Sequence, residues 1–174
     1  MDNVTTLPNP STGRPHSQRL RSDLAEIRAE LLQTIQTLTL DELNWSPRPD
    51  LNMKSFKQLL QEIGTMEKVT CHMASYQEEL EWPAVWESLD KNDLTTLLAD
   101  LANIRAETLA FLDACTEEQL QTPMPLTPEW QGYFHAPTVE PEVLLRWIVR
   151  HEYYHLGQLV TYQWQRGNLP VSGD

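Results

Sequence analysis

The chain has 174 residues, of which 40% are hydrophobic, and its 25 acidic and 13 basic side chains give a formal net charge of −12. This length and composition favour one globular domain with its own core. The strong negative charge repels phosphate backbones and anionic lipid, so we expect no nucleic-acid partner and no membrane association. No apolar run approaches the roughly 18 residues of a membrane span, and the first residues lack the apolar centre of a signal peptide. Cys71 and Cys115 form no paired motif, which agrees with a reducing, cytoplasmic location.

Apolar residues recur at three- and four-residue steps in four segments, which is the pattern of amphipathic helices. The second segment begins at Ser55, a suitable N-cap with Gln58 as its capping-box partner. The fourth is stopped by Gly167 and Pro170. The predicted helices cover, in chain order, about residues 20–38, 55–80, 93–114 and 141–166.

Two long connections separate the later helices. One follows the second helix from Trp82 to about Asn92, and the other, rich in proline, covers residues 116–141 after the third helix. No strand-like alternation is present. The pattern therefore predicts an all-α four-helix bundle with long connections after helices two and three. We expect the bundle to cover residues 17–166, between a flexible N-terminal tail (1–16) and a C-terminal tail (167–174).

The run HEYYH at residues 151–155 carries the strongest functional signal. His151 and His155 continue the apolar stripe of Leu144, Trp147 and Ile148, so both should face the bundle interior one turn apart. Two imidazoles at this spacing can direct ring nitrogens to one point, as metal sites require. Core histidines satisfied by hydrogen bonds are the alternative, but every ring nitrogen would then need its own partner away from water. The pair therefore predicts a metal site.

The same run matches the HExxH motif of zinc proteases, in which the glutamate is the general base. Such proteases take a third ligand downstream, yet after His155 the chain has no His or Glu, and Asp174 is its only acid. Glu152 lies about 100° around the helix from His151, toward a neighbouring helix or solvent. We therefore expect this protein not to be a protease of that class.

A third ligand must come from upstream, and Glu62 on the second predicted helix is the candidate. It lies one turn after Leu59 and one turn before Met66, at the border of the apolar stripe. A carboxylate that enters a bundle core needs a partner, and a cation is a natural one. A position at the edge that reaches water is the alternative. Glu67 and His72 compete for the role, but His72 lies about 15 Å along the helix from Glu62, so both cannot bind one ion.

These residues belong to two longer runs, LDELNWSPRPDLNMKSFKQLLQEIG (40–64) and LLRWIVRHEYYHLGQL (144–159). With them, the chain resembles the DinB/YfiT-like metalloenzymes over about residues 17–166. The most specific parts are the turn from Trp45 to Ser55 and the HExxHxGQ run that ends at Gln158.

The resemblance implies an up-down-down-up bundle, often a homodimer, with one divalent metal held by three side chains. Two of the ligands correspond to His151 and His155. The third, a histidine in the family, corresponds to Glu62, seven residues after Ser55. This replacement converts a three-histidine site to two histidines and one carboxylate. Zinc and nickel are the first expectation for such a site, and iron and manganese also suit it.

Some relatives are thiol-dependent transferases or isomerases, in which the metal favours and orients a thiolate. We therefore expect a metal-dependent enzyme that acts on a small molecule, with a low-molecular-weight thiol as a candidate substrate. No catalytic residue is evident beside the ligands. The alternatives are a non-catalytic metal-binding or stress-response bundle that binds a protein partner, and a bundle that has lost its metal. His135, in the 116–141 loop, could line a pocket, although a surface position is the simpler expectation.

Overall fold

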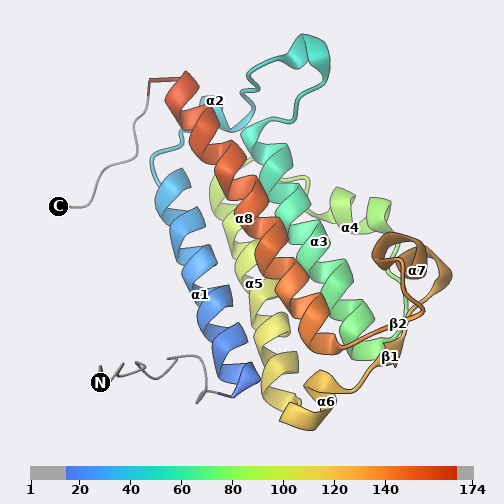
Figure 1. The fold of residues 1–174 in the computed structure, drawn as a ribbon. Helices are drawn as coiled ribbons and strands as arrows, with labels where there is room; N and C mark the ends of the chain where they lie inside the picture. Colours follow the sequence, from blue (N-terminus) through green and yellow to red (C-terminus); the bar gives the residue numbers. More distant parts are fainter. Residues whose placement is uncertain (1–14, 168–174) are drawn as a thin grey trace, which may run out of the picture.

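The computed structural model describes residues 15–167, and four long helices form its bundle (Figure 1). Helices α1 and α8 run in one direction and α3 and α5 run in the other, which confirms the expected up-down-down-up order. No helix in the described range is long and apolar enough to span a membrane. The predicted tails fall, apart from residues 15, 16 and 167, outside the described residues and stay predictions. The long helices are α1 (His16–Ile35), α3 (Phe56–Tyr76), α5 (Leu94–Ala114) and α8 (Pro141–Gln165).

The start of α3 follows the predicted capping box. The Ser55 hydroxyl accepts a hydrogen bond from the Gln58 backbone N–H at 3.3 Å, and the Gln58 side chain accepts one from the Ser55 N–H at 2.9 Å. The helix ends at Tyr76, a few residues earlier than expected, because Gln77 adopts a left-handed conformation (φ 58°) that terminates it. Hydrogen bonds between neighbouring residues therefore determine where α3 begins. This helix carries one residue of the site described below.

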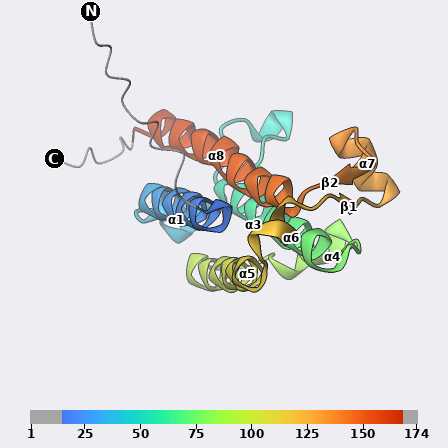
Figure 2. The ribbon, with the colours of Figure 1, turned by 60° about the horizontal axis from the view of Figure 1, so that its bottom comes forward.

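The connections contain short elements that the sequence did not reveal. The all-α class holds, and one short hairpin is added to it: β1 and β2 pair antiparallel with Met124 opposite Val139. Two residues per strand are too few for an alternating pattern to appear. The hairpin and α7 lie together on the side of the bundle next to α4 (Figure 2). The short elements are α2 (Leu40–Leu43), a 3-10 helix (Pro49–Leu51), α4 (Trp82–Ser88), α6 (Glu117–Gln121), β1 (Met124–Pro125), α7 (Pro128–Phe134) and β2 (Thr138–Val139).

An aromatic cluster attaches the turn before α3 to the C-terminal half of α8. The Trp45 and Phe56 rings lie 5.7 and 5.5 Å from the Tyr162 ring, centroid to centroid, and both pairs are edge-to-face. Each such pair contributes about 0.5–1.5 kcal/mol beyond the area it buries. At Gly64, α3 approaches α5 so closely that a Cβ would lie 2.5 Å from the Leu101 Cδ2 atom. These contacts fix α3 between α5 and α8.

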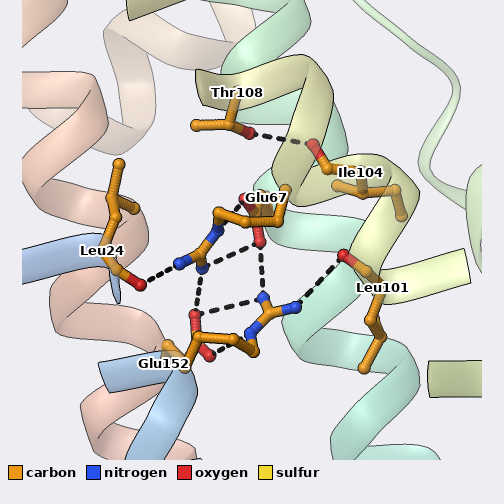
Figure 3. Close-up of polar contacts among 8 residues, drawn as sticks. Leu24, Glu67, Leu101, Ile104, Thr108 and Glu152 are labelled. Atoms are coloured by element: carbon orange, nitrogen blue, oxygen red, sulfur yellow. Dashed lines mark hydrogen bonds and ion pairs between the residues drawn. The ribbon is translucent and has the colours of Figure 1, made fainter. Parts of the chain in front are cut away.

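Four charged side chains, one from each long helix, meet in the bundle interior (Figure 3). Arg28 donates to Glu152 Oε1 at 2.7 Å and to Glu67 Oε2 at 2.8 Å. Arg105 donates to Glu67 Oε1 at 2.6 Å and also pairs with Glu152. The Glu67 and Glu152 side chains are each 1% exposed. We call these four residues, Arg28, Glu67, Arg105 and Glu152, the buried quartet; its two positive and two negative charges balance.

Replacing one carboxylate of the quartet should destabilise the fold strongly. The change Glu152→Gln removes one negative charge and leaves two buried guanidinium groups with a single carboxylate. Because breaking a buried ion pair costs about 3–5 kcal/mol, the free energy of unfolding should fall by about 3 kcal/mol or more in urea titrations. Glu30→Gln, at an exposed position of α1, is the control and should stay within about 0.5 kcal/mol of the parent. Equal stabilities of the two variants would contradict the role of the quartet.

Candidate metal centre

Glu62, His151 and His155, the three predicted ligands, come together between α3 and α8. His155 Nε2 lies 3.1 Å from His151 Nε2 and 3.6 Å from Glu62 Oε2. One ligand atom from each of the three residues lies within 4.8 Å of the others. The His155 side chain is 5% exposed and that of Glu62 17%, so the site is at the edge of the core and open on one side.

A hydrogen bond on the far side of His155 determines which ring nitrogen faces the site. His155 Nδ1 lies 2.7 Å from Gln158 Oε1, and the Gln158 amide nitrogen donates to the Tyr154 hydroxyl at 3.3 Å. Because the Gln158 oxygen can only accept, Nδ1 carries the proton. The lone pair of His155 Nε2 therefore points toward His151 and Glu62. Outer contacts of this kind orient histidine ligands in metal sites.

The spacing of the donor atoms fits one small divalent ion. Two nitrogens bound at about 2.0–2.1 Å to the same ion are separated by about 2.9–3.4 Å at ordinary ligand angles. The 3.1 Å between the two Nε2 atoms lies within this range, and the 3.6 Å to Glu62 is close to it. The same separation suits a hydrogen bond when His151 Nε2 carries a proton. The arrangement can therefore hold either a shared proton or a cation.

The environment keeps both rings neutral. Burial, together with the nearby His155 and the Lys54 ammonium, lowers the pKa of His151 from 6.5 to about 3. Burial also lowers the pKa of His155, although Gln158 and Glu62 act in the opposite direction. Neutral imidazole is the form that binds metals. At neutral pH both rings are therefore ready to act as ligands.

Lys54 supplies a positive charge at the open side of the site. Its ammonium forms an ion pair with Glu62 Oε2 and lies 5.8 Å from the centroid of the Trp86 ring. The Lys54 side chain is 42% exposed. The aromatic cluster of Trp45, Phe56 and Tyr162 anchors both ends of the turn that contains Lys54, so the backbone that carries this charge is held in place.

A profile of the DinB superfamily matches residues 23–159 of this chain. The chain belongs to the DinB superfamily. Among solved structures, a DinB-like protein of Bacillus subtilis (YjoA) aligns with a TM-score of 0.63 and 20% identity, covering 86% of this chain and 92% of that chain. YfiT of Bacillus subtilis, described as a probable metal-dependent hydrolase with an unusual four-helix bundle topology, aligns with a TM-score of 0.67 and 17% identity, covering 92% and 93%. At these identities the likeness shows the fold. A search of curated proteins found no match.

The other candidate residues lie elsewhere in this DinB bundle. Glu67, a competitor for the third ligand, belongs to the buried quartet, where the charges of Arg105 and Arg28 outweigh burial and keep its pKa below the ordinary value. The His72 ring lies 4.7 Å from the Tyr76 ring, centroid to centroid, at an interplanar angle of 42°. His135 is exposed at the end of α7 with a left-handed backbone (φ 53°). None of the three is among the grouped ligand atoms.

Glu152, the glutamate of the HExxH run, faces the bundle interior and is held by two arginines. It is therefore not placed to act as a general base. Sequence reasoning missed the quartet, although a signal was present. Each quartet residue follows a buried apolar residue by four positions and so occupies the apolar face of its helix. The pairs are Leu24 and Arg28, Ile63 and Glu67, Leu101 and Arg105, and Ile148 and Glu152.

Removing the charge of Lys54 should strengthen metal binding by this DinB protein. The Lys54 ammonium competes with a cation for Glu62, so Lys54→Met should lower the Kd for zinc by about three- to tenfold, as measured by competition with a chromophoric chelator. Lys68→Met is the matched control, because Lys68 is also partly exposed and pairs with a glutamate, Glu107, but lies outside the site. An unchanged or weakened affinity in the Lys54 variant would exclude the competition.

The metal-depleted protein should lose stability as the pH falls from about 6.5 toward 3. In this window the unfolded chain protonates His151 at its ordinary pKa, whereas the folded chain keeps it neutral. The unfolded state then binds more protons than the folded state. The contribution of His151 to the free energy of unfolding is therefore complete above pH 6.5 and decreases below it. Urea titrations of chelator-treated protein should show a smaller pH slope for His151→Asn than for the parent. Identical slopes would show that the histidine is not kept neutral by the fold.

Proposed function

We propose that this DinB-superfamily protein is a divalent-metal-dependent enzyme acting on small molecules, with Glu62, His151 and His155 as the metal ligands. One observation carries the proposal: the three donor atoms converge while Gln158 fixes the lone pair of His155 toward them. Three protein ligands leave coordination positions open for water or substrate, as catalytic sites require. The open side of the site, next to Lys54, is where a substrate would enter.

Two imidazoles and one carboxylate form a ligand set for zinc or nickel, and also for iron or manganese. When bound, such an ion would lower the pKa of a coordinated water or thiol and polarise a neighbouring carbonyl group. The residues of the site have separate roles. Glu62 and the two histidines would bind the ion, Gln158 orients His155, and Lys54 offers a positive charge to an anionic group of the substrate.

Water and a low-molecular-weight thiol are the two candidate nucleophiles. YfiT, whose fold is similar, is described as a probable hydrolase, and the sequence resemblance favours thiol transfer. Glu67 and Glu152 are held by arginines, so neither is a free base. Activation of the nucleophile would therefore depend on the metal. A cytoplasmic homodimer completes the proposal; α8 exposes Tyr153, Tyr154 and Trp164, which suit a subunit contact.

Protein purified without an affinity tag or chelator should contain about one divalent ion per chain by elemental analysis. His151→Ala and His155→Ala should each reduce the content to a small fraction, because two remaining ligands bind such ions weakly. His72→Ala and His135→Ala are matched controls and should retain the parent content, since neither side chain lies at the site. Full metal content in the His151 variant would refute the ligand assignment.

The reaction can be identified with one panel of small electrophiles, esters and amides, assayed with and without thiols. Zinc-loaded protein should consume one class, and removal of the metal should abolish turnover. Hydrolysis without thiol would identify water as the nucleophile, whereas strict thiol dependence would identify a transferase. If nothing reacts, and azide or thiols leave the spectrum of cobalt-substituted protein unchanged, the site is closed and the non-catalytic alternative holds.

A further inference from the structure

A cavity of about 340 Å³ lies one helical turn from the metal centre. We call it the aromatic pocket. The residues that line it include the aromatic residues Trp82, Trp130 and Tyr133, from α4 and α7, and Met66 on α3. Cavities of about this size and larger take small ligands and cofactors. In Figure 1 the three elements that form it lie together on one side of the bundle.

Met66 and Trp147 lie between the pocket and the metal centre in the sequence of helical turns. Met66 follows Glu62 by one turn of α3, and Trp147 precedes His151 by one turn of α8. The Trp147 indole N–H donates to the Met66 sulfur at 3.4 Å, and the Trp147 ring lies 5.3 Å from the Tyr133 ring and 6.3 Å from the His151 ring. Met66, which lines the pocket, therefore lies about 6 Å from Glu62 along the axis of α3.

The pocket lining carries negative charge and no positive charge. Glu79 and Glu129 are the two acidic residues among the described residues that line it, and both side chains are exposed. Glu79 accepts a hydrogen bond from the Thr127 hydroxyl, which holds its carboxylate in place. Aromatic faces attract cations, and quaternary ammonium groups are recognised by aromatic cages. Two carboxylates in the lining strengthen this preference and disfavour anions.

We propose that the aromatic pocket binds a small organic cation, an ammonium group on a compact apolar body. The rings of Trp82, Trp130 and Tyr133 contact the cation, and Glu79 and Glu129 supply the counter-charge. We assign this occupant as the recognition group of a substrate of the metal centre, because Met66 of the pocket lies one turn of α3 from Glu62. The assignment as substrate rests on the proposed function; binding of the cation itself does not require the metal.

The decisive experiment compares choline with 3,3-dimethylbutan-1-ol, a neutral molecule of nearly the same shape. Isothermal titration calorimetry and tryptophan fluorescence should show choline binding at least about fivefold more tightly, because only the charged molecule gains the cation–π and carboxylate attraction. The difference should shrink as salt is raised. Equal affinities of the two molecules, or no binding of choline, would overturn the proposal.

Variants locate the site. Glu129→Gln should weaken choline binding about two- to fivefold and leave 3,3-dimethylbutan-1-ol unaffected, and Trp130→Ala should weaken both. Glu118→Gln and Trp164→Ala, at exposed positions outside the pocket, are the controls and should bind like the parent. Circular dichroism verifies that each variant is folded, and the exposed position of Glu129 makes its change safe for the fold. Loss of choline binding in the controls alone would place the cation elsewhere.

His151→Ala separates this inference from the proposed function. The variant should lose the metal and keep the preference for choline over 3,3-dimethylbutan-1-ol. If the parent protein binds metal but does not prefer choline, the cation site in the pocket is refuted and the proposed metal enzyme is not. If the parent prefers choline but binds no metal, the proposed enzyme is refuted and the cation site is not.

Discussion

The buried quartet determines how the four helices align. Each long helix contributes one charge, so a helix that slides by one turn leaves two arginines with one carboxylate, or two carboxylates with one arginine, in the core, at a cost of several kcal/mol. The same alignment places the metal ligands. Glu67 follows Glu62 by five residues on α3, and Glu152 follows His151 directly on α8. When the quartet closes between α3 and α8, Glu62 therefore faces the two histidines. The polar core and the metal centre share one helix register.

This register explains why HEYYH does not act as it does in a zinc protease. The motif specifies two imidazoles one turn apart and a glutamate about 100° around the helix. Its chemistry then depends on what packs against each face. Here the face of His151 and His155 meets Glu62, whereas the face of Glu152 meets Arg28 and Arg105. The glutamate thus stabilises the bundle, and no carboxylate of the motif remains for proton transfer.

Local rules were enough to predict the helices and to propose the ligands. Apolar spacing and the Ser55 capping box gave the start of α3, and the four-residue spacing of His151 and His155 placed both on the inner face. Pairings between distant segments were not predictable in this way. Glu67 meets arginines and Glu62 meets a histidine, although both carboxylates lie on or beside the apolar stripe of α3. Which partner each one meets depends on the register between helices, and the sequence of one helix does not encode that register. The hairpin of β1 and β2 was missed because its strands are too short to show a period.

The distribution of the quartet along the chain also sets an order of events during synthesis. Before α8 leaves the ribosome, the nascent chain holds Arg28 and Arg105 but only Glu67 to balance them. The first three helices therefore cannot close a neutral interior, and their docking is expected to stay loose. The last helix delivers the missing carboxylate together with two of the three proposed ligands. Completion of the core and assembly of the metal centre thus both wait for the synthesis of α8, and a ribosome-bound intermediate lacking α8 should remain accessible to chaperones and proteases.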